Sequence, residues 1–168
     1  MRMKAFLSIT GSITLVFLFS FNSLLHGAEK RAPPFTLHDV DGNTRKLSDF
    51  AGKVVVIDFW ATWCHECKDS SPELERVYRN YKDRGVILLG ISLDEGRSAV
   101  KKVKKFSDNL NLTYPMLMGD KKTARAYAIR GIPATYILDK NHIIVKQYMG
   151  ALFGLGDMIS SQIEKLLE

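Results

Sequence analysis

The sequence predicts an α/β fold in which a central mixed sheet carries helices on both faces. Two near-continuous apolar runs, 53–59 and 86–93, have the β-branched composition of strands covered on both faces. Each run is followed by a stretch with the apolar spacing of an amphipathic helix. Near the C-terminus, 134–139 and 143–149 are separated by a short turn, which favours an antiparallel hairpin at one edge of the sheet.

The chain before the first buried run is expected to form a hairpin. Extended segments at 35–37 and 44–46 flank an Asp-Gly pair at 41–42, which is typical of hairpin turns. Ser48 is expected to cap a short helical turn that follows. No repeat and no low-complexity stretch indicates a second domain, so we expect 33–168 to be one domain.

Helical patterns follow at four places along the chain. They occupy 65–83, 97–109, 121–128 and 155–167. A short extended piece at 113–118 separates the second from the third. Pro72 lies inside the first helix and is expected to kink it, because proline lacks an N–H and clashes with the preceding turn.

Much of the formal net charge of +6 comes from the lysines of 101–105. Val100, Val103 and Phe106 recur beside them at helical spacing, so we expect these three to point inward and the lysines to form a solvated face. A patch for anionic lipid or an acidic partner is the alternative. Nucleic acid is not an expected partner, since no aromatic interleaving or recognised motif accompanies the charge.

Residues 1–28 have the composition of an export signal. Arg2 and Lys4 form a basic start, an apolar run follows, and no acidic residue occurs before Glu29. This pattern predicts delivery to an extracytoplasmic compartment, either the periplasm or the outer face of the cytoplasmic membrane. A cleaved signal peptide and a retained N-terminal membrane anchor both remain open, because the apolar run is near the roughly 20 residues that span a bilayer.

The chain's two cysteines, Cys64 and Cys67, follow the first buried strand and open the first predicted helix. Free N–H groups and the positive end of the helix dipole favour a thiolate at Cys64. Cys67 lies one turn further on the same face, within reach of a disulfide. A bond closing so small a loop would constrain little chain entropy, so a catalytic thiol–disulfide pair is favoured over a structural staple.

These residues resemble the thioredoxin superfamily, and most closely its TlpA/ResA-like group of membrane-associated periplasmic oxidoreductases. The resemblance is carried by the segment 56–64, by Pro72 and by Gly-Ile-Pro-Ala-Thr at 131–135. An extra β-α segment at about 93–118 is typical of this group. The resemblance implies a thioredoxin-like fold with an N-terminal hairpin and this inserted segment, over nearly all of 33–168.

The resemblance also implies roles for individual residues. Cys64 is the attacking thiol and Cys67 the resolving one. Pro133 is a cis-proline that faces the pair, and Ile132 before it pairs with the substrate backbone. Asp58 matches a buried acid that assists proton transfer to the resolving cysteine. A carboxyl group inside a run of valine and isoleucine is costly to ionise, so we expect the pKa of Asp58 to be raised.

The side chains around the cysteines are expected to pack near the site or to act on the charge of the Cys64 thiolate. Trp60 and Trp63 are expected to pack in the core, with Trp63 also shielding the site and contacting substrate. A cationic His65 would stabilise the Cys64 thiolate, whereas Glu66 would oppose it. Because the two effects roughly cancel, this motif does not predict the redox potential.

Several positions depart from the family's pattern. Ser70 stands where ResA-like proteins often carry glutamate, and Asp58 stands where this group often has asparagine. The loop typical of the CcmG branch is absent, which argues against that branch. His142 replaces a glycine usual in the last hairpin, so Asn141 is expected to supply the left-handed residue.

The favoured function is a thiol–disulfide oxidoreductase that needs no cofactor and acts on protein thiols and disulfides. Reduction is expected, for example in cytochrome c maturation, with a membrane electron donor; an oxidase or isomerase is the alternative. A metal-binding module of Cys64, His65, Glu66 and Cys67 is disfavoured, because consecutive residues at a helix start cannot all converge on one ion. A peroxidase is disfavoured because Thr62 lies two residues before Cys64, not three.

Overall fold

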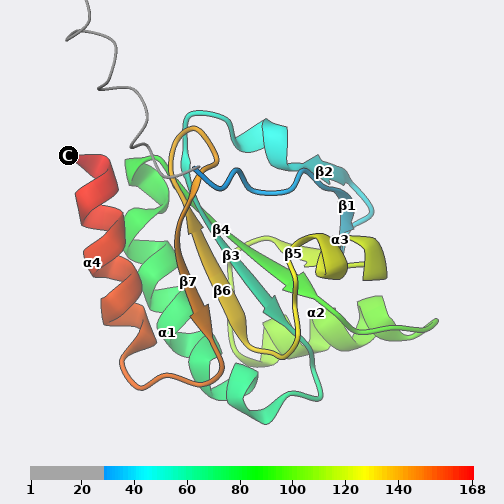
Figure 1. Cartoon of the computed structure of the whole chain (residues 1–168). Helices are drawn as coiled ribbons and strands as arrows, with labels where there is room; N and C mark the ends of the chain where they lie inside the picture. The colour runs from blue at the N-terminus through cyan, green and yellow to red at the C-terminus, as the bar shows by residue number, and fades with distance from the viewer. Residues whose placement is uncertain (1–28) are drawn as a thin grey trace, which may run out of the picture.

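The computed structural model describes residues 29–168, and in this range seven strands form one sheet (Figure 1). Their spatial order is β2-β1-β5-β4-β3-β6-β7. The strands are β1 (Thr36–Asp39), β2 (Thr44–Lys46), β3 (Val54–Trp60), β4 (Val86–Ser92), β5 (Met116–Met118), β6 (Ala134–Leu138) and β7 (Ile144–Met149). Neighbours among β3, β4 and β5 run parallel, whereas the other pairs are antiparallel. The mixed sheet predicted from the sequence is confirmed.

Four α-helices and two 3₁₀ helices connect the strands within the described range. They are η1 (Leu47–Phe50), α1 (His65–Tyr81), η2 (Lys82–Arg84), α2 (Ala99–Asn109), α3 (Lys121–Ala126) and α4 (Leu155–Leu167). All four α-helices were expected from the sequence, with bounds within two residues. The first ends early because the chain tightens into η2 and then turns at Gly85, which has a φ of +80°.

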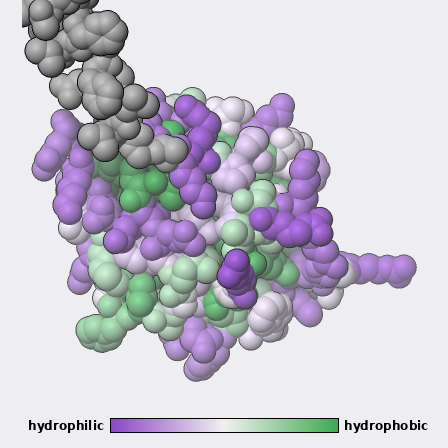
Figure 2. All heavy atoms as spheres, viewed as in Figure 1, coloured by the Kyte–Doolittle hydropathy of each residue, from purple (hydrophilic) through white to green (hydrophobic). Residues whose placement is uncertain are grey.

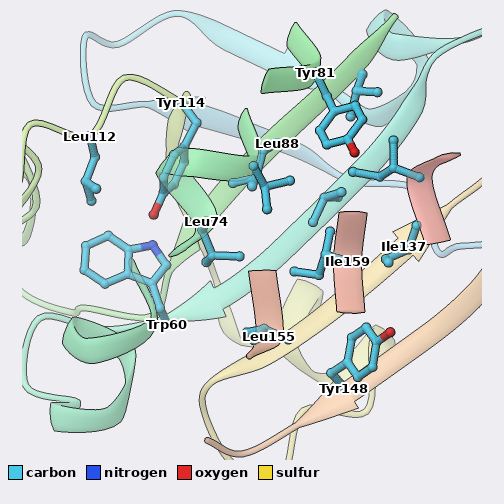
Figure 3. Packing of buried hydrophobic residues seen from close by; sticks show 14 of the residues in the cluster. Trp60, Leu74, Tyr81, Leu88, Leu112, Tyr114, Ile137, Tyr148, Leu155 and Ile159 are labelled. Carbon is cyan, nitrogen blue, oxygen red and sulfur yellow. The ribbon is translucent and has the colours of Figure 1, made fainter. Parts of the chain in front are cut away.

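One face of the sheet packs against α1, α2 and α4. In Figure 1, α1 and α4 lie side by side on the left of the sheet, and the two helices are in contact. Figure 3 shows the apolar side chains of this face, with Leu74 from α1 and Leu155 and Ile159 from α4 near Trp60 and Ile137 of the strands. Burial of this cluster holds the start of α1 against the carboxyl end of β3.

The opposite face is covered by the N-terminal segment, by η1 and by the chain that follows α3. Its buried cluster includes Phe35, Leu47 and Tyr127 from these coverings, packed against Ile57 and Phe59 of β3. Both faces of β3 are therefore covered, and all seven of its residues are buried. This accounts for the continuous apolar run in the sequence.

The register of the central strands places two partners beside Asp58. On one side β4 brings Gly90 opposite Asp58, and on the other β6 brings Thr135. Pro133 directly precedes β6, so it lies near the end of β3 where the chain turns toward α1. The sheet thus gathers segments that are far apart in the sequence at one pole of the molecule.

The inward face of α2 differs from the sequence prediction. Val103 is fully buried and Phe106 is partly buried, but Val100 is 41% exposed. The helix begins at Ala99, which is buried, so the apolar stripe runs through positions 99, 103 and 106. The prediction that Val100 points inward is wrong because the stripe starts one residue earlier.

Two predicted turn residues are also wrong. The short helical turn begins at Leu47, and the Asp49 carboxylate accepts a hydrogen bond from the Lys46 N–H at 2.7 Å, so Ser48 is not its cap. In the last hairpin His142, not Asn141, takes the left-handed conformation, with a φ of +61°. The Asp139 carboxylate accepts the N–H groups on either side of His142 in sequence, which determines the shape of this turn.

The predicted signal peptide or anchor, residues 1–28, lies outside the described residues. Within 29–168 there is no helix with the length and apolar character needed to cross a membrane. The first described residues are tied to the last hairpin: Arg31 pairs with Ile143, and the Ile144 N–H donates to the Lys30 carbonyl at 2.9 Å. The chain therefore enters the domain beside the β6–β7 turn.

Candidate active site

Cys64 and Cys67 form a disulfide at the start of α1, directly beyond the carboxyl end of β3. Cys64 is the N-cap residue, and its Sγ accepts a hydrogen bond from the Cys67 N–H at 3.1 Å. Cys64 is 6% exposed and Cys67 1% exposed. A sulfur that faces the free N–H groups of a helix start gains most from being a thiolate, so Cys64 has the environment of an attacking thiol.

Asp58 lies on β3, on the sheet face that α1 covers, and is 2% exposed. Burial raises the pKa of its carboxyl to about 7, and the hydroxyl of Thr135, which donates to Oδ1 at 2.8 Å, opposes that rise. The raised pKa predicted from the sequence is confirmed. A carboxyl group that titrates near neutral pH can both take and return a proton during exchange.

Aromatic side chains seal the strand next to Asp58. Gly90, its partner on β4, has so little room that a Cβ there would lie 2.9 Å from Tyr114 Cε2 and 3.1 Å from Trp60 Nε1. Figure 3 shows the rings of Tyr114 and Trp60 on this face. Glycine at this position leaves room for these rings beside the strand that carries Asp58.

The loop before β6 lies at the same pole. The peptide between Ile132 and Pro133 is cis, as the family resemblance implies. The Pro133 carbonyl accepts a hydrogen bond from the Gly150 N–H at 2.9 Å, so this loop is joined to the chain after β7. Ile132 is partly buried and packs against both apolar clusters.

The two tryptophans near the cysteines differ. Trp60 is 1% exposed, as expected for a core residue, and it packs on Phe106 with ring centroids 4.5 Å apart. Trp63 is 71% exposed, so its predicted place in the core is wrong. By this point the chain has left β3 and turns over the surface before α1 begins, so the Trp63 side chain faces solvent.

His65 and Glu66 lie between the cysteines and point to solvent. The His65 ring is 83% exposed, and its Nε2 is 3.7 Å from Oδ2 of Asp69, one turn along the helix. Glu66 lines a groove of about 300 Å³ together with Leu152 and Phe153 of the β7–α4 loop. The acidic neighbour of His65 recorded in the structure is thus Asp69 rather than Glu66.

Sequence reasoning missed a buried carboxylate beside the cysteine turn. Asp94 is 6% exposed, and its two oxygens accept the Thr62 hydroxyl at 2.6 Å and the Thr62 N–H at 2.8 Å. The Ser92 hydroxyl donates to Asp94 at 2.9 Å. One signal was available: Asp94 comes two residues after β4, a buried parallel strand, and the carboxyl ends of such strands form sites.

Exposed apolar side chains at this pole were missed as well. Among the described residues, six large apolar side chains are exposed, and four of these come from the cysteine turn or from the end of β7 and its following loop: Trp63, Met149, Leu152 and Phe153. Phe153 projects completely into solvent. No sequence pattern distinguished Phe153 from a core residue.

A thioredoxin-like fold with a helix-capping Cys-x-x-Cys disulfide defines a thiol–disulfide oxidoreductase. The chain belongs to the AhpC/TSA family, whose model matches residues 28–147. This chain is 35% identical over 138 positions to the thiol-disulfide oxidoreductase ResA of Geobacillus kaustophilus. The matched region covers 82% of this chain and 74% of that protein. The ResA of Bacillus subtilis is 29% identical over 163 positions, covering 90% and 89%.

Solved structures agree with this assignment. The thioredoxin domain of a thiol-disulfide oxidoreductase from Bacteroides vulgatus superposes with a TM-score of 0.72 at 27% identity, over 84% of this chain and 99% of that one. The resemblance to ResA-like proteins stated from the sequence is confirmed, and so is the thioredoxin-like fold. This protein is a thiol–disulfide oxidoreductase with Cys64 and Cys67 as its redox pair.

Proposed function

We propose that this protein reduces disulfides of other proteins outside the cytoplasm. The observation that carries the proposal is the Cys64–Cys67 disulfide at the start of α1, with the buried Asp58 carboxyl on the strand that leads to it. In the reduced protein, the Cys64 thiolate attacks a substrate disulfide, forms a mixed disulfide and releases one substrate thiolate.

The second step uses Cys67. Its thiol gives up a proton and attacks Sγ of Cys64, which releases the second substrate thiol and restores the Cys64–Cys67 disulfide. Asp58 is the proton acceptor we propose, because its pKa of about 7 matches such a transfer at neutral pH. A dithiol donor, proposed to be a membrane protein, then returns two electrons and two protons to the pair.

The surface around the disulfide supports a protein substrate. Trp63, Leu152 and Phe153 expose apolar area at the pole where Cys64 lies. In Figure 2, hydrophobic atoms gather at the lower left of the molecule, where Figure 1 places the β7–α4 loop. Exposed apolar side chains beside a reactive group are typical of an interaction surface. We propose that Trp63, Ile132 and Pro133 contact the substrate chain, with Phe153 at the edge.

We further propose that residues 1–28 export the domain, residues 33–168, and remain as an anchor or are removed. The basic, then apolar composition of this segment supports export. Arg31 pairs with Ile143 at the pole opposite the disulfide, so an anchored domain would present Cys64 away from the membrane. Cytochrome c maturation is the pathway we propose, on the resemblance to ResA-like proteins.

A peroxidase activity receives no support from the contacts of the threonine that precedes the cysteines. The Thr62 hydroxyl donates to Asp94 and is not directed to Cys64.

His65 and Glu66, the proposed modulators of the thiolate, are both exposed to solvent. No group of three His, Cys, Asp or Glu side chains suited to a metal ion occurs among residues 29–168.

The direction of electron flow is tested by the midpoint potential of the Cys64–Cys67 pair. We expect equilibration with glutathione or dithiothreitol buffers to place it in the reducing half of the range between about −270 mV for thioredoxin and about −120 mV for DsbA. We also expect the reduced protein to reduce the disulfide of a protein substrate. A potential more positive than about −170 mV would contradict the reductant role and favour an oxidase or isomerase.

A further inference from the structure

The turn that leads into Cys64 is joined to the end of β4 by a set of short polar contacts. The Leu93 N–H donates to the Trp60 carbonyl at 2.7 Å, and both the N–H and the hydroxyl of Thr62 donate to the Asp94 carboxylate. The Cys64 N–H in turn donates to the Ala61 carbonyl at 3.1 Å. Asp94 therefore restrains the backbone two residues before the attacking sulfur.

Asp94 also places a negative charge there. Its carboxylate accepts hydrogen bonds from Thr62 and Ser92, and no lysine, arginine or histidine forms an ion pair with it in the part of the chain that the structure describes. The adjacent Glu95 does have a cation, with Lys121 Nζ 3.5 Å from its Oε1. The Asp94 charge is thus buried, held by dipoles and not neutralised by an opposite charge.

We propose that Asp94 is a positioning residue whose charge makes the Cys64–Cys67 pair more reducing. The carboxylate contacts Thr62, two peptide units from Cys64, so its separation from the sulfur is on the order of 10 Å or less. A fixed anion at that range disfavours a thiolate at Cys64. Because the thiolate belongs to the reduced state, disfavouring it shifts the equilibrium toward the disulfide.

This inference deepens the proposed function and rests on its reductant direction. Other charged groups near Cys64 also act on its thiolate: His65 and Glu66 on α1, both solvated, and Asp58 on β3, which burial keeps close to half-neutral at pH 7. Asp94 differs from His65 and Glu66 because it is buried, and from Asp58 because it accepts hydrogen bonds from the turn that carries Cys64. Water therefore screens its charge less than the charges of His65 and Glu66.

The test removes the charge of Asp94 and its hydrogen bond to the Thr62 hydroxyl in separate variants. Asp94→Asn removes the charge and keeps an acceptor for Thr62, whereas Thr62→Val keeps the charge and removes one hydrogen bond. Asp39→Asn is the matched control, because Asp39 is 8% exposed and accepts several hydrogen bonds, but lies on β1. Alkylation rates of Cys64 against pH and the reduced fraction in glutathione buffers are measured for each, with urea unfolding to verify the fold.

For Asp94→Asn we expect a rise of about three- to tenfold in both the ratio of thiolate to thiol at Cys64 and the equilibrium constant for reduction of the pair. Thr62→Val and Asp39→Asn should show no rise. A change below twofold in Asp94→Asn, or an equal rise in Thr62→Val, would overturn the inference. If Asp94→Asn does not fold, Asp94→Ser is measured by the same criteria. The parent's own potential tests the reductant role independently of these differences.

Discussion

The two faces of β3 show how one strand serves two purposes. Val55, Ile57 and Phe59 point to the face covered by the N-terminal segment, where the cluster is apolar apart from tyrosine hydroxyls that donate to backbone carbonyls. The other face carries Asp58, with a carboxyl whose pKa is raised to about 7 by burial. Both faces are equally inaccessible to solvent, with no β3 residue more than 2% exposed.

Stability and chemistry are thus located on different faces of β3. On the face with Phe59, each β3 side chain is apolar and packs against other apolar side chains, so its burial raises the free energy of unfolding. On the face with Asp58, a carboxyl group is held with a single hydrogen-bond donor, Thr135, so burial costs free energy when the group is ionised. We infer that this cost is retained because α1 brings Cys67 to the same face.

The sharpest test of the reactive face is Cys64→Ser. Loss of the attacking sulfur should lower the rate of protein-disulfide reduction by more than about 100-fold. The rate is measured by mixing the reduced enzyme with a protein substrate that contains a disulfide. Cys67→Ser is the matched variant and should accumulate mixed disulfides, visible on non-reducing gels. Brief alkylation at mildly acidic pH should label Cys64 in the reduced parent. Adducts in Cys64→Ser but not in Cys67→Ser would reverse the two roles.

The opposite face is tested by Phe59→Ala. Phe59 is fully buried, with its ring centroid 5.1 Å from Tyr127 and 5.9 Å from Tyr136, so truncation should lower the free energy of unfolding by about 3–5 kcal/mol. Urea unfolding measures this loss. The pH dependence of Cys64 alkylation should stay that of the parent in the folded variant. A shifted profile would show that the two faces are not separable.

Asp58→Asn tests how the buried carboxyl group makes stability depend on pH. The folded-state pKa is about 7 and the ordinary value is 3.8, so between these values the unfolded chain ionises first and binds fewer protons than the folded protein. The contribution of Asp58 to the stability of the parent should therefore fall as pH rises from about 4 to about 7, by up to about 4 kcal/mol. Asp58→Asn should lose this contribution, so the difference in stability between parent and variant, measured by urea unfolding at several pH values, should change with pH in this range.

The same variant should slow disulfide exchange about 10- to 100-fold at neutral pH, because the resolving step loses its proton acceptor. The rate is followed between pH 6 and 9. Thr135→Val is a matched control, since it removes the donor to Asp58 and keeps the carboxyl. Exchange kinetics identical to the parent across that range would leave Asp58 with a structural role only.

Phe153→Ala is expected to have the smallest effect. If Phe153 contributes to docking, KM for an unfolded protein disulfide should rise about fivefold, the equivalent of about 1 kcal/mol. Reduction of a small disulfide such as oxidised glutathione should not change. Val100→Ala, which also truncates an exposed apolar side chain but on α2, is the control. Equal effects on both substrates would remove Phe153 from the docking surface.

Much of the fold could be predicted from local patterns. Buried strands, amphipathic helices and the Asp-Gly hairpin each depend on residues that are close in sequence, and the structure has all of them near the expected bounds. The errors at Val100, Ser48 and Asn141 are local too. They arose because a one-residue change in where a helix or turn begins alters which side chain is buried or capping.

The cysteine pair, the buried acid and the order of strands and helices follow from local periodicity and spacing, so the amino-acid sequence was enough to predict them. The hydrogen bond from Thr135 to Asp58 joins residues 77 positions apart, and the one from Thr62 to Asp94 joins residues 32 positions apart. These contacts, and the exposure of Trp63 and Phe153 to solvent, are set by the packing of the folded chain. Such contacts depend on how the strands pair and where loops cross the surface, and no local pattern records either.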